Sequence, residues 1–180
     1  MGAIVFKLTL RLTILLRRRR KVRGFDVVFP KDMSSGRIDR VIANLSDAIH
    51  WISASDADVT HALHDAIQYL LLSDELSSIQ MADNRLVVFP RLWVESAKVD
   101  HLVASLLAIA ATHATLKLAA REQVGRENEG RIVARISQLL HQIELPVDPP
   151  PIVGVRDRVR RAQALVDLGV SPTIAEWLRG

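Results

Sequence analysis

The sequence predicts a mainly α-helical protein: a helical bundle of five to six helices with an N-terminal β-strand (or strand pair) and a small central β-hairpin. Three observations lead to this fold class. Apolar residues recur at three- and four-residue spacing through most of residues 37–144, which is the period of amphipathic helices. Residues 6–14 alternate apolar and polar side chains, as half-buried strands do. Two short apolar runs within residues 78–89 flank Asp83 and Asn84, which favour turns, and this arrangement predicts the hairpin.

Composition limits both the size and the chemistry of the protein. A chain of 180 residues with 49% hydrophobic and 24% charged residues is long enough for one domain with a substantial core. It contains no cysteine, which excludes disulfides, thiolate metal sites and cysteine nucleophiles. Residues 1–40 hold 11 Lys/Arg and 3 Asp/Glu, whereas residues 41–180 hold 13 and 17. This concentration of positive charge at one end predicts a polyanionic partner.

The N-terminal segment carries most of that charge. The strand expected over residues 6–14 would expose Lys7 and Arg11, and residues 27–30 predict a second short strand beside it. The first strand leads into a cluster in which six of seven residues are basic: Arg17, Arg18, Arg19, Arg20, Lys21 and Arg23. Guanidinium groups pair bidentately with phosphates, so the cluster is a candidate contact with a nucleic-acid backbone. A solvated basic turn, or a contact with the acidic body, is the structural alternative.

The same segment does not fit the common targeting signals. A secretory signal carries its positive charges before the apolar stretch, and here they follow it. Residues 4–16 offer thirteen positions, two of them charged, where a membrane-spanning helix needs roughly 20 apolar residues. The sixth residue is Phe6 rather than the Ser or Thr of a myristoylation motif. A mitochondrial presequence stays open as an alternative, and we expect a cytoplasmic protein without a transmembrane segment.

Helical patterns dominate the rest of the chain. We expect a helix over residues 37–53, then a cap at Ser55 and Asp56 for a second helix that continues to about Leu72. A long helix is expected from Leu92 to about Glu122, and another over residues 128–144. The middle of the long helix, residues 102–111, is apolar almost all round. Such a helix lies at the centre of a bundle or is buried in an oligomer.

The expected organisation has four parts. Residues 1–36 form the basic strand segment and residues 37–146 the helical body, with the hairpin near 78–89. Residues 147–154 form a proline-rich linker, and residues 155–180 a C-terminal helical hairpin. A winged helix–turn–helix is less favoured because no convincing recognition helix precedes the central hairpin. The C-terminal hairpin also resembles a helix–turn–helix in outline, but its second helix is short and exposes Glu176.

Motifs for catalysis or cofactor binding are not evident. His61 and His64 are three residues apart but are expected on the solvent face of their helix, so we predict no metal site. Gly125 and Gly130 have the spacing of a phosphate loop, but Arg131 and Ile132 stand where Lys and Ser/Thr are required. We therefore expect no enzyme activity and no cofactor.

These observations favour a non-enzymatic, nucleic-acid-associated subunit of a larger ribonucleoprotein-type complex that contacts phosphates without reading sequence. RNA is favoured over DNA, and other protein subunits are expected partners. Besides the N-terminal cluster, a second candidate basic patch consists of Arg156, Arg158, Arg160 and Arg161. A homo-oligomer or lateral packing is expected through Leu102, Leu106, Leu107, Ile109 and Trp51.

Three alternatives remain. The first is a structural or assembly protein of a phage or secretion machine, whose N-terminal strand adds to the sheet edge of a partner. The second is a peripheral protein on an anionic membrane, with the arginine run at the head groups. The third is a sequence-specific DNA-binding regulator.

Overall fold

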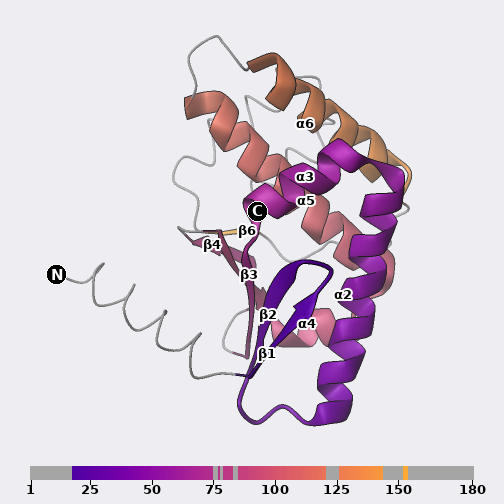
Figure 1. Ribbon diagram of the computed structural model, residues 1–180, viewed down its shortest axis with the longest axis vertical. Helices are drawn as coiled ribbons and strands as arrows, with labels where there is room; N and C mark the ends of the chain where they lie inside the picture. Colours follow the sequence, from indigo (N-terminus) through magenta and orange to yellow (C-terminus); the bar gives the residue numbers. More distant parts are fainter. Residues whose placement is uncertain are drawn as a thin grey trace, which may run out of the picture.

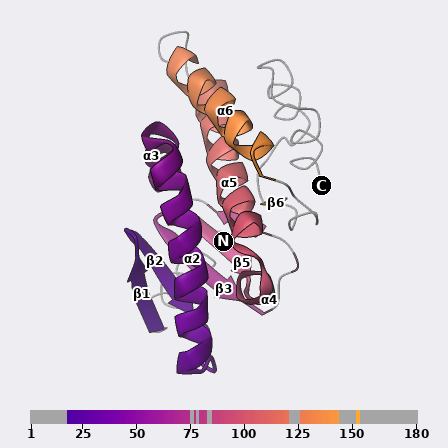
Figure 2. The ribbon, with the colours of Figure 1, turned by 90° about the vertical axis from the view of Figure 1, so that its right-hand side faces the viewer.

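A six-stranded mixed β-sheet with helices packed on one face organises the protein (Figures 1 and 2). The computed structural model describes residues 18–74, 77, 79–82, 85–120, 126–143 and 152–153. The strand order is β1-β2-β3-β5-β4-β6. β2, β3 and β5 are parallel, β1 and β4 run antiparallel to their neighbours β2 and β5, and β6 is parallel to β4. The strands are β1 (Arg18–Val22), β2 (Phe25–Phe29), β3 (Tyr69–Ser73), β4 (Ile79–Ala82), β5 (Leu86–Pro90) and β6 (Ile152–Val153).

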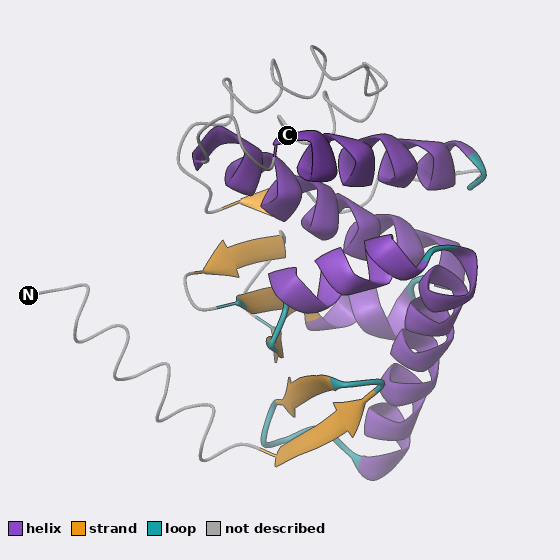
Figure 3. Ribbon diagram, turned by 45° about the horizontal axis from the view of Figure 1, so that its top comes forward, coloured by secondary structure: helices purple, strands orange, loops and turns teal. Residues whose placement is uncertain are grey.

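The helical layer is built from two sequence blocks (Figure 3). α2 (Ser35–Ser55) and α3 (Ala57–Ala66) form the crossover that joins β2 to the parallel strand β3. α4 (Arg91–Ser96), α5 (Val99–Ala120) and α6 (Arg126–His141) follow β5. Asp56 separates α2 from α3: its backbone is extended, and its carboxylate accepts hydrogen bonds from the N–H groups of Asp58 and Val59. This N-cap confirms the predicted helix start.

The two faces of the sheet carry two separate apolar clusters. In β3, Leu70 and Leu72 point into the main core beneath the helices. Leu71 points to the opposite face, where it packs with Val28 and Val88 in a smaller cluster. Because both faces of the central strands are apolar, β3 and β5 appear in the sequence as continuous hydrophobic runs without alternation.

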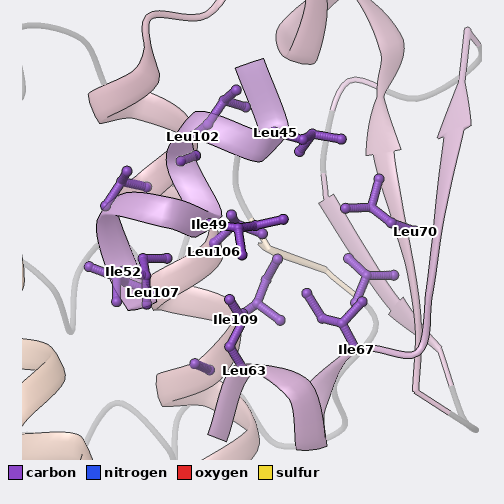
Figure 4. Packing of buried hydrophobic residues seen from close by; sticks show 14 of the residues in the cluster. Leu45, Ile49, Ile52, Leu63, Ile67, Leu70, Leu102, Leu106, Leu107 and Ile109 are labelled. Atoms are coloured by element: carbon purple, nitrogen blue, oxygen red, sulfur yellow. The ribbon is translucent and has the colours of Figure 1, made fainter. Parts of the chain in front are cut away.

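α5 lies in the middle of the main core. It packs against α2, α3 and α6, and its residues 101–112 are all buried; Figure 4 shows Leu102, Leu106, Leu107 and Ile109 among the core side chains. Leu102, Leu106, Leu107 and Ile109 are each at most 1% exposed. The segment Val99–Lys117 is long and apolar enough to cross a membrane, but 78% of its most apolar window is buried inside the protein. Its all-round hydrophobicity is therefore explained by its position in the core.

The prediction of a mainly α-helical bundle with a small hairpin is wrong. The predicted hairpin exists as β4 and β5, but it belongs to a six-stranded sheet in which β5 lies between β3 and β4. The helix expected to continue to Leu72 ends at Ala66, and Tyr69–Ser73 is a parallel strand. A short apolar run has no periodicity that separates a buried strand from a helix, which is why the error arose there.

Other elements agree more closely with the sequence pattern. The first predicted helix is confirmed as α2, and the helix expected over residues 128–144 is confirmed as α6. The long helix expected from Leu92 is instead two helices, α4 and α5, because Ala97 is extended. Trp93 links them: its indole N–H donates to the Ser105 hydroxyl at 3.3 Å and its ring stacks on His101.

Several predictions lie outside the described residues. These are the strand over residues 6–14, the turn at Asp83 and Asn84, and the C-terminal hairpin over 155–180. Most of the expected proline-rich linker also lies outside them. Its residues Ile152 and Val153, however, form β6, which pairs with β4.

Replacing a core leucine of α5 should destabilise the protein. We expect Leu106→Ala to lower the free energy of unfolding by about 2–5 kcal/mol, because it leaves a cavity among buried side chains. Leu92→Ala is the matched control, since Leu92 is 67% exposed and its truncation should change stability by no more than about 0.5 kcal/mol. Urea unfolding followed by circular dichroism measures both. Equal losses in the two variants would contradict a core position for α5.

Candidate functional site

The basic cluster forms the edge strand β1 and the turn that follows it. Arg18, Arg19, Arg20 and Lys21 are all exposed, and Val22 is the first buried residue of the strand. β1 is the first strand of the sheet order, and none of the described strands pairs with its outer edge. Arg18–Val22 thus forms a strand itself, and the strand predicted before it, over residues 6–14, lies outside the described residues.

The register of β1 against β2 directs the basic side chains to both faces of the sheet. Arg18 and Arg20 pair with Phe29 and Val27, which point into the core on the helical side. Arg19 and Lys21, at the alternate positions, therefore lie on the opposite face. Positive charge consequently borders both sides of the sheet edge.

A tight turn at Arg23 and Gly24 fixes the end of this hairpin. Both residues have positive φ, 43° and 95°, as a two-residue type I′ turn requires. Arg23 also donates a hydrogen bond from Nε to the hydroxyl of Ser46 on α2, at 3.0 Å. The turn packs against α3, where the ring of His64 stacks on Phe25 with a centroid separation of 4.3 Å. His64 is therefore half-buried, and the expectation that it lies on the solvent face is wrong.

The environment of His64 lowers the pKa of its imidazole. Burial is the main cause, and the nearby charges of His61 and Arg85 add to it. The ring is accordingly neutral at pH 7 and supports the turn as an apolar surface.

A hollow of about 250 Å³ separates β1 from the first turns of α2. Its charged and polar lining comes from the arginines of β1 and from Ser35 and Asp39 of α2, and Phe29 and Ile38 supply its apolar lining. The N-cap residue Ser34 makes no side-chain hydrogen bond to the helix. The first N–H groups of α2 thus have no side-chain cap, and they add partial positive charge near the arginines.

Among the described residues, no ion pair neutralises the basic side chains of the hairpin. Within the described part of the chain, the ion pairs involve Arg37, Arg91, Lys117 and Arg135, and none involves a residue of β1 or its turn. Five basic side chains are thus exposed and make no ion pair within the described part of the chain: Arg18, Arg19, Arg20, Lys21 and Arg23.

The remaining predicted site residues divide into two groups. Lys7, Arg11, Arg17 and the second basic patch (Arg156, Arg158, Arg160 and Arg161) lie outside the described residues. The residues expected at a lateral interface are buried in the core of this chain, except Trp51, which is half-buried against that core. Leu102, Leu106, Leu107 and Ile109 have no exposed surface to offer a second copy, so we place no partner contact on them.

A network of five charged side chains closes the carboxyl ends of the three parallel strands. Asp32 follows β2, Asp74 follows β3 and Arg91 follows β5. The Arg91 Nε lies 2.5 Å from the Asp74 carboxylate, and Arg37 donates two hydrogen bonds to Glu95, which raises the pKa of Arg37. Ligands often bind at this edge of parallel sheets. Here both arginines lie against carboxylates of the chain itself, so we assign the network to holding α2 and α4 against the strand ends.

A second hollow, of about 280 Å³, lies between α3, α5 and α6. Lys117 of α5 lies 2.7 Å from the Asp65 carboxylate of α3, and this contact lowers the pKa of Asp65. His113, one turn before Lys117, has its pKa lowered mainly by burial. Glu129 of α6 is only 5% exposed. The sequence pattern does not predict this cluster; its one signal there is the pair of polar residues His113 and Lys117 in a nearly apolar helix.

Gly24 allows a direct test of the hairpin geometry. A Cβ at this position would lie 2.8 Å from Cε1 of His64, and its φ of 95° is unfavourable for L-residues. We expect Gly24→Ala to lower the free energy of unfolding by about 1–2 kcal/mol. Gly36→Ala is the control, because nothing lies within 4 Å of its added Cβ; its effect should lie between neutral and about 1 kcal/mol stabilising. Thermal or urea unfolding measures the stability of both variants. An unchanged free energy of unfolding in Gly24→Ala would refute the turn geometry.

Comparison with known proteins adds no assignment. No family model, no curated protein and no solved structure matches the chain. Its function is therefore argued from the side chains and geometry described above.

Proposed function

We propose that the protein is a non-enzymatic, nucleic-acid-associated subunit of a larger ribonucleoprotein-type complex, and that the hairpin β1–β2 contacts the phosphate backbone. The observation that carries this proposal is the set of five exposed basic side chains on one edge strand and its turn, without an acidic partner among the described residues. A concentration of this kind attracts polyanions, and binding releases the counterions condensed on the nucleic acid.

The geometry favours backbone contact over base readout. Residues on the same face of a strand are about 6.8 Å apart, so β1 presents a row of charges to each side rather than a single pocket. Arg18 and Arg20 border the hollow beside α2, where the uncapped N–H groups of the helix favour a phosphate further. Aromatic side chains for base stacking are sparse near the cluster, since Phe25 and Phe29 are both buried.

A second candidate function is strand addition, because the outer edge of β1 is not paired by any described strand. A partner strand would bind there through main-chain hydrogen bonds. Consecutive basic side chains on an edge strand oppose such pairing, as natural proteins use charged edges to prevent it. The same charges favour a polyanion, which places nucleic acid ahead of a partner strand.

Replacing the basic residues two at a time tests the proposal. We expect Arg18→Ser with Arg20→Ser to weaken binding of a labelled single strand and to reduce the slope of log K against log salt by about 1.4, because each lost phosphate contact removes about 0.7. Arg19→Ser with Lys21→Ser reports on the opposite face. Lys98→Ser with Arg131→Ser is the control, since it removes the same charge from exposed positions on the helical layer.

Fluorescence anisotropy at several salt concentrations, with RNA and DNA in parallel, provides the measurement, and the RNA/DNA ratio identifies the partner class. If the control loses as much affinity as the β1 variants, net charge alone explains the effect and the contact is not specific to β1. Binding that does not respond to salt would favour strand addition. Binding to anionic vesicles but to neither nucleic acid would replace the proposal with a membrane role.

A further inference from the structure

The hollow between β1 and α2 is lined by charged groups of both signs that do not pair with each other. Arg18 and Arg20 border it from β1, and Asp39 borders it from α2. Among the described residues, no ion pair or hydrogen bond joins either arginine to Asp39. The arginines and lysines of the other charge clusters in this part of the chain all lie against carboxylates. The hollow thus presents donors and an acceptor that a ligand can occupy together.

The two walls of the hollow follow from the periods of a strand and a helix. Arg18 and Arg20 are two residues apart in β1, so they lie on one face of the strand, about 6.8 Å apart. Ser35 and Asp39 are four residues apart in α2, so they lie on one side of the helix. One wall therefore carries two guanidinium groups, and the facing wall carries a hydroxyl and a carboxylate.

The size of the hollow limits what it can hold. Its volume is about 250 Å³, and the buried side chains of Phe29 and Ile38 supply an apolar part of its lining. Pockets for drug-sized ligands measure about 300–1,000 Å³, so this hollow suits a smaller group. One phosphate with its sugar is a group of that kind, and the C–H groups of a sugar can pack against apolar side chains.

The carboxylate of Asp39 selects among the phosphates that the arginines attract. Guanidinium groups make strong charge-assisted hydrogen bonds to phosphate, but a ligand that is only an anion is repelled by Asp39. A ligand that also carries a hydroxyl donor turns this repulsion into a hydrogen bond. Ribose has such a donor in its 2′-hydroxyl group, which DNA lacks. An unpaired carboxylate beside two unpaired arginines therefore matches a ribonucleotide better than a deoxyribonucleotide.

We propose that this hollow distinguishes RNA from DNA. Arg18 and Arg20 hold one phosphate of the strand, and the Asp39 carboxylate accepts a hydrogen bond from a ribose 2′-hydroxyl. Phe29 and Ile38 pack against the sugar, so the contact reads the backbone and not the bases. This inference rests on the proposed function, because it names the kind of nucleic acid that the hairpin β1–β2 contacts.

Oligonucleotides that differ only at the 2′ position test the inference on the unaltered protein. Labelled single strands of uridine, 2′-deoxyuridine and 2′-O-methyluridine, all of one length, share their bases and phosphates. We expect the uridine strand to bind about tenfold more tightly than either of the others, because only its 2′ position can donate a hydrogen bond to a carboxylate. Fluorescence anisotropy at constant salt measures the three affinities.

Two outcomes of this comparison separate the inference from the proposed function. If the uridine strand binds no more tightly than either of the other two, and all bind in a salt-dependent manner, the inference is overturned while phosphate contact by the hairpin stands. If none of the three strands binds, both the inference and the proposed function are overturned.

One variant and a matched control assign the preference to Asp39. We expect Asp39→Ala to bind all three strands with affinities within about twofold of each other, because the acceptor for the 2′-hydroxyl is gone. Asp47→Ala is the control, since Asp47 is also exposed on α2 but does not line the hollow. Both variants lose one negative charge, so general electrostatic attraction rises equally in the two. A tenfold preference for uridine that persists in Asp39→Ala, or that is lost equally in Asp47→Ala, would refute the assignment.

Discussion

The burial of α5 is the constraint on which the rest of the structure depends. A helix that is apolar on every side is stable only if protein surrounds it, and here α2, α3 and α6 pack around it within the helical layer of the main core. Its burial determines where the crossover helices lie, because α2 and α3 must cover the helix while joining two parallel strands. The sheet closes the core from the other side, because inward side chains of β2, β3 and β5 belong to the same apolar cluster as α5.

As a result of this packing, the clusters of charged side chains lie at the edges of the molecule. The main core is filled by aliphatic and aromatic side chains. Charges gather instead at the outer strand β1, at the carboxyl ends of the parallel strands and between the outer helices. Of these three places, the strand-end network is internally paired, whereas β1 and its turn carry five basic side chains without an ion pair among the described residues. A tight turn and the stacking of His64 on Phe25 hold the edge strand in place, so the backbone that carries the basic side chains is fixed.

The sequence predicted helices better than strands, for a physical reason. The patterns of α2 and α6 are amphipathic because one side of each helix faces solvent, and the period is visible. Leu70, Leu71 and Leu72 are buried on both faces of a parallel strand, so no alternation distinguishes them from a helical run. The break at Ala97 has no Gly or Pro signal and depends on tertiary packing of Trp93. The basic cluster was identified from composition, but its place on an edge strand and the cluster around Glu129 depend on contacts between distant segments.

The central claim, that β1 is the polyanion-binding surface, is tested most directly by hydrogen exchange with and without a single-stranded oligonucleotide. Edge-strand amides exchange readily unless a ligand covers them, so the measurement locates the contact without altering the protein. The account predicts added protection confined to residues 18–29 and the first turn of α2, and its loss at high salt. Protection centred on α6 or on the strand ends, with β1 unchanged, would contradict it.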